Sequence, residues 1–529
     1  MGVWLALGIL LQVFVYTLAG AGKAYIHMDE AFSLALAQYD KIDITANEDF
    51  YNTWHKKEYF QDYLAVQQKD LGNFEPVYEN QKNDVHPPLY YMLLRGVMEV
   101  EALGGSEEFS KWPPIILNMV IMAGCTVLLY AVFREVIGQE KRGRYLALGL
   151  AVAAGLTVAG VSTVVYIRMY GLLTLMVLLT VWVALKMNRE WREKRTVGWK
   201  WYVMLGIVAV LGTLTQYYYL FFLLGLAMMM VVKLVCEKEW RELVKYSGSL
   251  VGAGVMVLVL WPHIIQHMFF GYRGQGALAN LVNLPVLGRQ LWGYILIVDY
   301  NVFHRLGLGI VVAILGLVGY RKWRKMEAAR FSEEFWIVFW PTVSYFSLAA
   351  IASPFRELRY IMPVCGLIFG LAIYVMGRLM SGVIKEGCRE VVMFGVVSVV
   401  LLVVPAQLRL GWMRIELLYR DRQAVMTIVD KVPEAPILYF ITTENNRFLD
   451  NILPFAAADE SYLALDLVKP TVGEVKEILE GKNLSEGLIV FVSTSQEIEQ
   501  TLEVVKEATG LRQVNFVQAV NTCNVYYLD

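Results

Sequence analysis

The sequence is poor in charged residues. Only 18% of its 529 residues are Asp, Glu, Lys or Arg, whereas 57% are hydrophobic and the mean hydropathy is +0.47. Because apolar runs of about 20 residues recur along it, the chain is not a soluble globular protein but a polytopic membrane protein. Its net charge is only -1, so we expect no nucleic-acid partner.

Cysteine is also scarce and lacks the spacing of metal ligands. The five cysteines are Cys125, Cys236, Cys365, Cys388 and Cys523. Only Cys523 falls in a region that we place outside the cell. We therefore predict neither a disulfide framework nor a zinc site. Internal repeats and low-complexity segments are absent from the sequence as well.

Apolar runs long enough to cross about 30 Å of hydrocarbon recur within the first 410 residues. They predict eleven transmembrane helices, at 3–22, 112–133, 145–165, 169–186, 201–215, 217–233, 247–265, 304–320, 334–352, 358–377 and 391–410. A cleaved signal peptide is the alternative for the first run. We favour a retained helix because the best site candidates follow it directly. The stretch 88–103 is short and carries charges, so it predicts a helix on the membrane surface.

Basic residues gather in five turns between the predicted helices. These turns are 134–144, 186–200, 233–245, 321–330 and 378–389. The positive-inside rule places them in the cytoplasm. The N-terminus is then cytoplasmic, and the first loop and the C-terminal region are extracellular. We expect a multi-pass protein of a plasma membrane, and a bacterial one fits this pattern.

After residue 410 the composition becomes that of a soluble domain. The pattern predicts strands at 436–442, 462–467, 488–493, 512–520 and 524–528, with amphipathic helices at 446–456, 472–480 and 496–508. Residues 411–529 are therefore predicted to form a small extracytoplasmic α/β domain. Since it has no glycine-rich phosphate loop and no nucleophile elbow, we assign it no chemistry.

The loop between the first two predicted spans is acidic. From Lys23 to Pro88 it carries 12 acidic residues and 6 lysines. Asp29 and Glu30 follow the first span, where a carboxylate is a natural general base for a hydroxyl or an amine. The alternative is a solvated start of the loop. The other end of the loop holds Asp84 and His86-Pro87-Pro88. These residues are either a second part of the same site or only a rigid entry to a helix.

Cations gather at the face that is predicted to be external. They are Lys111, Arg168, Arg273, Arg356 and Arg359, with Tyr170 and Tyr360 beside two of them. A single arginine there is often a snorkelling anchor, but several together indicate a bound anion such as a lipid-linked phosphate. At the tip of a predicted hairpin, Gln216-Tyr217-Tyr218-Tyr219 is either part of an interfacial aromatic belt or a surface for stacking a sugar.

Together these motifs resemble the GT-C superfamily of membrane glycosyltransferases, in particular the branch with protein O-mannosyltransferases and lipid A aminoarabinose transferases. The likeness covers roughly residues 1–380. The matching motifs are Asp29-Glu30, His86-Pro87-Pro88-Leu89, Lys111, Arg168-Met169-Tyr170 and Thr215-Gln216-Tyr217-Tyr218. Lys111 stands where the family has arginine, and Gln216 where it has histidine. A lysine keeps the charge but loses the bidentate geometry.

The resemblance implies a GT-C-like module over residues 1–410, with its external loop at 23–111. Its implied activity is inverting transfer of a sugar from a polyprenyl-phosphate donor to an acceptor at the external face. Asp29 would be the general base, and Glu30 would orient either Asp29 or the acceptor. The donor phosphate would contact Arg168, Tyr170 and Lys111. Sugar or acceptor would contact His86, Asp84, Tyr217, Tyr218, Arg273, Arg359 and Tyr360.

Several points stay open at this level. Some relatives use a divalent ion, so Mg²⁺ or Mn²⁺ near Asp29 and Glu30 is one expectation. Membrane lipids are expected partners, whereas the sugar and the acceptor, which is a glycan, a lipid or a protein, are not specified. The alternative functions are a flippase or transporter of lipid-linked sugars and a non-catalytic subunit of glycan assembly.

Overall fold

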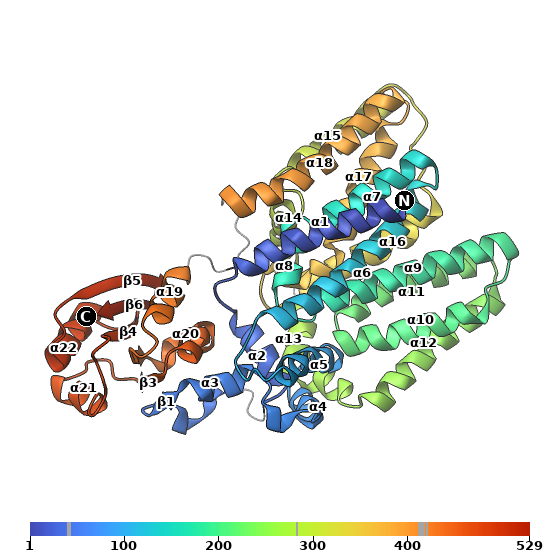
Figure 1. Cartoon of the computed structure of the whole chain (residues 1–529). Helices are drawn as coiled ribbons and strands as arrows, with labels where there is room; N and C mark the ends of the chain where they lie inside the picture. Colours follow the sequence, from blue (N-terminus) through green and yellow to red (C-terminus); the bar gives the residue numbers. More distant parts are fainter. Residues whose placement is uncertain (40–43, 282–283, 411–417, 419–421) are drawn as a thin grey trace. The chain divides into compact units, whose positions relative to one another are not determined.

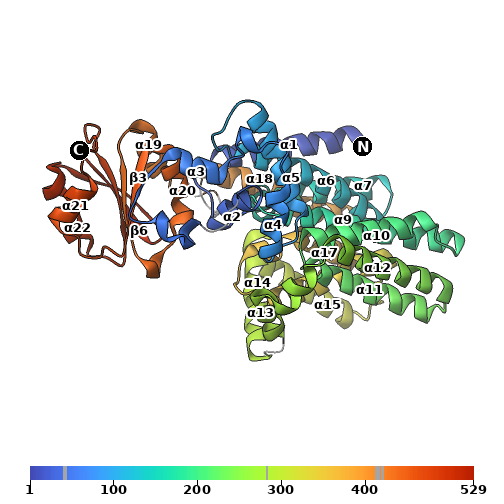
Figure 2. The same cartoon turned by 90° about the horizontal axis from the view of Figure 1, so that it is seen from below.

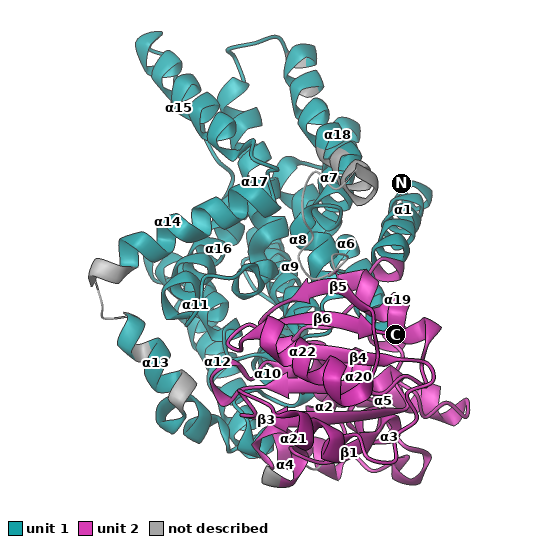
Figure 3. Ribbon diagram, turned by 90° about the vertical axis from the view of Figure 1, so that its left-hand side faces the viewer, with its two compact units in different colours: residues 1–19, 81–90, 115–415 teal, residues 20–80, 91–114, 416–529 magenta. Residues whose placement is uncertain are grey.

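The computed structural model describes residues 1–39, 44–281, 284–410, 418 and 422–529. The chain divides into two compact units (Figure 3). Unit 1 comprises residues 1–19, 81–90 and 115–415, and unit 2 comprises residues 20–80, 91–114 and 416–529. Unit 1 is helical, whereas unit 2 contains a β-sheet (Figure 1).

Helices occupy all eleven ranges in which spans are predicted. They are α1 (Gly2–Ala21), α6 (Trp112–Ile137), α7 (Lys141–Gly155) with α8 (Val158–Val165), α9 (Tyr170–Lys194), α10 (Trp199–Thr215), α11 (Tyr219–Cys236), α12 (Trp240–Leu260), α15 (Gly307–Trp323), α16 (Glu333–Ala352), α17 (Met362–Met380) and α18 (Glu386–Leu410). Among the described residues, seven helices are long and apolar enough to cross a membrane, or eight if the bent pair α7 and α8 forms one span. The number of spans therefore stays a prediction.

No element was predicted for residues 266–303, and most of the described residues in this range are helical. A π-helix, η4 (Gln266–Phe270), is followed by α13 (Tyr272–Leu281) and α14 (Leu284–Asn301). The apolar pattern of α14 is interrupted by Arg289 and Asp299, and this explains why it did not stand out as a span.

In unit 1, α8 begins after a break and ends at the turn that carries Arg168. Helices α7 and α8 meet at 54°. Thr157 begins α8 as its N-cap, and its Oγ1 accepts a hydrogen bond from the Gly160 N–H at 3.0 Å. After α8, the Nδ2 of Asn118 in α6 donates to the carbonyl oxygens of Val164 at 3.1 Å and Tyr166 at 2.9 Å. This amide fixes the turn between α8 and α9.

Unit 2 has a six-stranded sheet in the order β1-β3-β2-β4-β6-β5. The parallel core consists of β3 (Glu460–Leu465), β2 (Ile437–Ile441) and β4 (Leu488–Ser493), and β6 (Cys523–Leu528) and β5 (Val514–Val520) extend it antiparallel. One face carries α21 (Val472–Ile478) and α22 (Ile498–Thr509), and the other carries α19 (Gln423–Lys431) and α20 (Ile452–Ala457) (Figure 2). The α/β domain that the sequence predicts is therefore confirmed.

The first strand of this sheet comes from the acidic loop. β1 (Trp54–Lys56) pairs antiparallel with β3, with Trp54 opposite Tyr462. Trp54 donates its Nε1–H to the carbonyl oxygen of Ile478 at 3.0 Å, and the Lys482 Nζ lies 4.2 Å from the ring centre. The loop also contains α2 (Met28–Leu36), α3 (Lys57–Leu64), α4 (Glu75–Asn83) and α5 (Leu89–Leu103), the last at the predicted surface helix. The loop up to residue 80 thus shares unit 2 with the C-terminal region, whereas residues 81–90 belong to unit 1.

Candidate functional site

Glu30 is a fully buried member of the acidic pair. Its Oε2 accepts hydrogen bonds from the Lys23 Nζ at 3.0 Å and from the His27 N–H at 2.7 Å. Both charged side chains have no exposed surface. Burial lowers the pKa of the Lys23 ammonium, and the Glu30 carboxylate acts in the opposite direction. Glu30 therefore stabilises the loop from inside.

Asp29 lies in the first turn of α2 and keeps about a quarter of its side chain exposed, at 24%. His27 is the N-cap, and its Nδ1 accepts a hydrogen bond from the Asp29 N–H at 3.0 Å. This Nδ1 accepts, so the ring proton of the neutral imidazole is on Nε2. The reciprocal bond from His27 N–H to Glu30 completes a capping box that fixes the helix start.

Lys111 contacts the same segment in unit 2. Its Nζ donates to the carbonyl oxygen of Lys23 at 2.5 Å. Burial, followed by the charge of Lys23, lowers the pKa of the Lys111 ammonium. Lys111 therefore contacts the main chain of Lys23, whose side chain binds Glu30.

One carboxylate of the acidic pair is open to the expected divalent cation. Mg²⁺ and Mn²⁺ favour oxygen ligands, usually including more than one carboxylate or several waters. Here the Glu30 carboxylate is already bound to Lys23 and to the His27 N–H, so Asp29 is the only carboxylate of the pair that faces outward. In the described part of the chain, no group of three His, Cys, Asp or Glu residues is arranged to hold a metal.

In unit 1, Arg168 is held by a chain of two polar side chains, His86 and Asp84. Its Nη2 donates to the His86 Nε2 at 3.3 Å, and the His86 Nδ1 contacts the Asp84 Oδ2 at 2.5 Å. Since arginine has no acceptor, His86 Nε2 must accept and its Nδ1–H must donate to Asp84. Arg168 is 6% exposed. This arrangement fixes both the tautomer of His86 and the orientation of the guanidinium.

The charge of Asp84 depends on this chain. Burial acts to raise the pKa of the Asp84 carboxyl, but His86 and Arg168 more than offset it and the pKa lies below its usual range. Asp84 is thus an anion at neutral pH. The predicted candidates Asp84, His86 and Arg168, which are far apart in the sequence, do lie together.

A second network lies beside the same loop end and includes two residues that the sequence analysis missed. Trp261 donates its Nε1–H to the Tyr217 hydroxyl at 3.0 Å, and Tyr217 lies 2.8 Å from the His267 Nδ1. His267 Nε2 contacts the carbonyl oxygen of Lys82 at 3.1 Å. Burial lowers the pKa of His267, so this imidazole is neutral. The signal in the sequence was a pair of histidines, His263 and His267, in a chain with six.

The remaining aromatic and basic candidates form a third group in unit 1. Tyr170 stacks on Tyr166 with ring centres 6.0 Å apart, and the Arg359 Nη1 donates to the Tyr166 hydroxyl at 3.0 Å. Arg359 lies over the Tyr360 ring at 5.2 Å, and Tyr360 faces Tyr218 at 5.8 Å. Four candidates from distant parts of the sequence, Tyr170, Tyr218, Arg359 and Tyr360, are therefore linked by contacts through Tyr166 and one another.

The candidates are divided between the two units. Asp29, Glu30 and Lys111 belong to unit 2, and the remaining candidates belong to unit 1. Arg273 lies in α13, and its side chain is outside the described residues. Their joint action stays a prediction.

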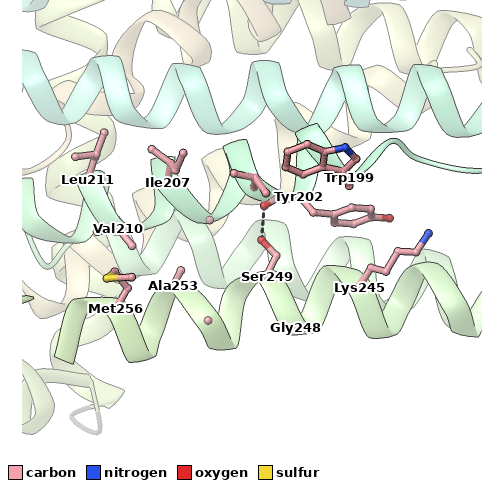
Figure 4. A pocket seen from close by; sticks show the side chains of 13 residues that line it. Trp199, Tyr202, Ile207, Val210, Leu211, Lys245, Gly248, Ser249, Ala253 and Met256 are labelled. Atoms are coloured by element: carbon pink, nitrogen blue, oxygen red, sulfur yellow. Dashed lines mark hydrogen bonds between the residues drawn. The ribbon is translucent and has the colours of Figure 1, made fainter. Parts of the chain in front are cut away.

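A cavity of about 640 Å³ opens between α10 and α12 (Figure 4). Its wall is apolar apart from Ser249, Tyr202, Trp199 and Lys245. The Lys245 Nζ lies 2.7 Å from the Glu242 Oε1, so its charge already has a partner. None of the predicted site residues lines this cavity, and we assign it no part in the chemistry.

Comparison with known proteins gives one family match. Residues 85–265 match the family described as dolichyl-phosphate-mannose-protein mannosyltransferase. The crystal structure of ArnT from Cupriavidus metallidurans bound to undecaprenyl phosphate is similar at 12% identity and a TM-score of 0.47, over 99% of this chain and 98% of that one. An oligosaccharyltransferase from Archaeoglobus fulgidus is similar at 11% identity and a TM-score of 0.43, over 94% and 70%. No curated protein matches.

The matched segment contains His86, Arg168, Tyr170, Tyr217 and Tyr218. The predicted resemblance to the GT-C membrane glycosyltransferases is therefore confirmed. The protein is a multi-pass membrane protein in which residues 85–265 are similar to this mannosyltransferase family, and it has a small α/β domain.

Proposed function

We propose that this protein transfers a sugar from a polyprenyl-phosphate donor to an acceptor at the external face of the membrane. The observation that carries the proposal is the position of Arg168. It lies in the segment that matches the mannosyltransferase family, and His86 and Asp84 hold its guanidinium. A planar guanidinium is well shaped to bind a phosphate. The family description names a dolichyl-phosphate-linked mannose, which makes a polyprenyl-phosphate mannose the first donor to test.

The proposed reaction is a single displacement with inversion at the anomeric carbon. Asp29 accepts the proton of the acceptor hydroxyl or amine, and the freed electron pair forms the new bond to C1. The bond from C1 to the phosphate oxygen breaks, and the polyprenyl phosphate leaves with the electron pair. Arg168, with Lys111 and Tyr170, stabilises the additional negative charge on that phosphate.

The contacts of the supporting residues refine their proposed roles. Glu30 is buried and bound to Lys23 and His27, which supports a role in holding Asp29 rather than in touching the acceptor. His86 uses its two ring nitrogens for Asp84 and Arg168, which supports a role in orienting the phosphate-binding arginine. Tyr217, Tyr218, Arg273, Arg359 and Tyr360 remain proposed contacts of the sugar or acceptor. No metal is assigned a role.

The test uses purified full-length protein in lipid with a panel of radiolabelled polyprenyl-phosphate sugars. Asp29→Asn should lower turnover by about 10²- to 10⁴-fold and retain donor binding, because only the base is lost. Arg168→Ala should weaken donor binding and lower turnover by about 10²- to 10³-fold. Arg324→Ala, which removes an exposed arginine from a basic turn, is the matched control and should behave like the wild type.

Two results would contradict the proposal. Full turnover by Asp29→Asn would show that Asp29 is not the general base. Movement of labelled lipid across liposomes without release of sugar would favour the flippase.

A further inference from the structure

The C-terminal domain holds the segment that carries Asp29. The Ala24 N–H donates to the carbonyl oxygen of Leu418 at 2.8 Å. The Arg422 guanidinium lies over the Tyr25 ring at 5.4 Å. The Met28 N–H donates to the Asp450 Oδ1 at 2.8 Å. Three contacts from residues about 400 positions away thus fall within five residues of the loop, all of them inside unit 2.

Asp450 is the residue of this group that reaches the start of α2. It lies in η9 (Phe448–Asn451), directly before α20, and is 3% exposed. Its Oδ2 lies 3.7 Å from the Arg447 Nη1, and its main-chain carbonyl accepts from the Arg422 Nη1 at 3.3 Å. A buried carboxylate needs charged or hydrogen-bonding partners. The Asp450 carboxylate has the Met28 N–H at Oδ1 and the Arg447 guanidinium near Oδ2.

The N–H groups at the start of α2 are satisfied by different acceptors. A helix leaves its first N–H groups without partners inside the helix, and these must be bound from outside. The His27 N–H binds Glu30, the Asp29 N–H binds the His27 imidazole, and the Met28 N–H binds Asp450. The first two acceptors lie in the loop itself. Asp450 is therefore the contribution of the C-terminal domain to this turn.

We propose that Asp450 is a positioning residue for the general base Asp29. The inference rests on the proposed function. By binding the Met28 N–H, Asp450 fixes the backbone one residue before Asp29 and so sets where the Asp29 carboxylate meets the acceptor. A displacement of about 1 Å in a reacting group can cost about 10²-fold in rate. The C-terminal domain, for which the sequence indicated no chemistry, then acts on the reaction through this turn.

The experiment compares Asp450→Ala, Asp450→Asn and Asp466→Ala in the full-length protein. Asp466 is the control, because its Oδ1 accepts from the Thr443 N–H at 2.8 Å, a bond between two residues of the C-terminal domain. Hydrogen exchange measures the backbone of residues 24–36, and turnover is measured in parallel. Asp450→Ala should speed exchange there and lower kcat by about 10- to 100-fold, with the KM for the donor unchanged. Asp450→Asn should recover most of both, because its amide oxygen can still accept.

Met28→Pro tests the same bond from the other side, and it serves if Asp450→Ala does not fold. Met28 is the first residue of α2, where proline is tolerated because its missing N–H is not needed inside the helix. Met28→Pro should lower kcat as Asp450→Ala does. The double variant Met28→Pro, Asp450→Ala should have a kcat no lower than that of either single variant, because both changes remove the same hydrogen bond. Unchanged exchange in Asp450→Ala, or faster exchange with normal kcat, would overturn the inference. If the wild type transfers no sugar, the proposed function fails, whereas the exchange result still decides whether Asp450 holds the turn.

Discussion

Charged side chains at the candidate site are bound by other side chains of the same protein. Lys23 pairs with Glu30 at 3.0 Å, and Arg168 is oriented by His86 at 3.3 Å. Charged groups that leave water are costly unless they are paired, so these contacts are needed for the charges to persist. The same contacts preorganise the site, because an oriented cation needs little rearrangement when a phosphate arrives.

The buried Lys23–Glu30 pair allows a stability prediction. Lys23→Met leaves the Glu30 carboxylate buried without its cation and should cost about 3–5 kcal/mol of unfolding free energy. The double variant Lys23→Met, Glu30→Gln removes both charges, while its glutamine oxygen can still accept from the His27 N–H. It should therefore be more stable than Lys23→Met. Thermal unfolding in detergent tests the order, and a double variant that melts below the single one would contradict it.

Asp84 gives the molecule a pH-dependent contribution to stability. His86 and Arg168 hold its folded pKa below the usual range against the effect of burial, so the stabilisation is complete above the unfolded pKa of about 4. It is lost as the pH falls through the lower folded pKa. Asp84→Asn should therefore reduce stability by about 1–3 kcal/mol near neutral pH.

The difference in unfolding free energy between the wild type and Asp84→Asn should shrink as the pH is lowered from about 5 to about 2. This window lies below the ordinary pKa of histidine, about 6.5, so the change can be attributed to a carboxyl group. Melting temperatures over this range measure it. Asp49→Asn, which changes an exposed carboxylate, is the control. A difference that stays constant over the window would show that Asp84 has no lowered pKa in the folded protein.

Among the elements, regular patterns were predictable from the sequence and long-range pairings were not. The predicted strand at 488–493 coincides with β4 (Leu488–Ser493), because its apolar run is bounded by polar turns. β1 (Trp54–Lys56) was missed, because three residues carry no periodic signal and their partner strand lies some 400 residues away. Part of the predicted helix at 446–456 is the 3₁₀-helix η9, which precedes α20.

The candidate site shows the same limit. The order of motifs along the chain was enough to propose Asp84, His86 and Arg168, and the structure brings these three together. The adjacent Asp29 and Glu30 predicted an acidic dyad, yet Glu30 is buried against Lys23. Such a pairing depends on how the backbone turns between residues 23 and 30. Asp450 was not predictable at all, since its contact with Met28 exists only after the C-terminal domain has folded.

For the molecule as a whole, the ends of α9 define two faces of unit 1. Near its C-terminal end, Lys186 binds Glu135 of α6 at 2.7 Å and Arg192 binds Glu334 of α16 at 2.6 Å. Its N-terminal end follows Arg168 directly. With 25 residues at about 1.5 Å each, α9 exceeds the roughly 30 Å of a hydrocarbon core. We therefore predict that Arg168 and the basic turns beside the C-terminal end of α9 lie on opposite sides of the membrane.

The positive-inside rule then predicts which side is cytoplasmic, and native thiols can test it. Cys236 and Cys388 are exposed and lie in or beside basic turns, whereas the other three cysteines are buried. In right-side-out membrane vesicles, a membrane-impermeant maleimide should leave both exposed thiols unlabelled until the vesicles are opened. The variant Ser485→Cys places a thiol at an exposed position of the C-terminal domain and should react at once. The reverse pattern would place Arg168 and the C-terminal domain in the cytoplasm, and a donor presented at the external face could then not reach them.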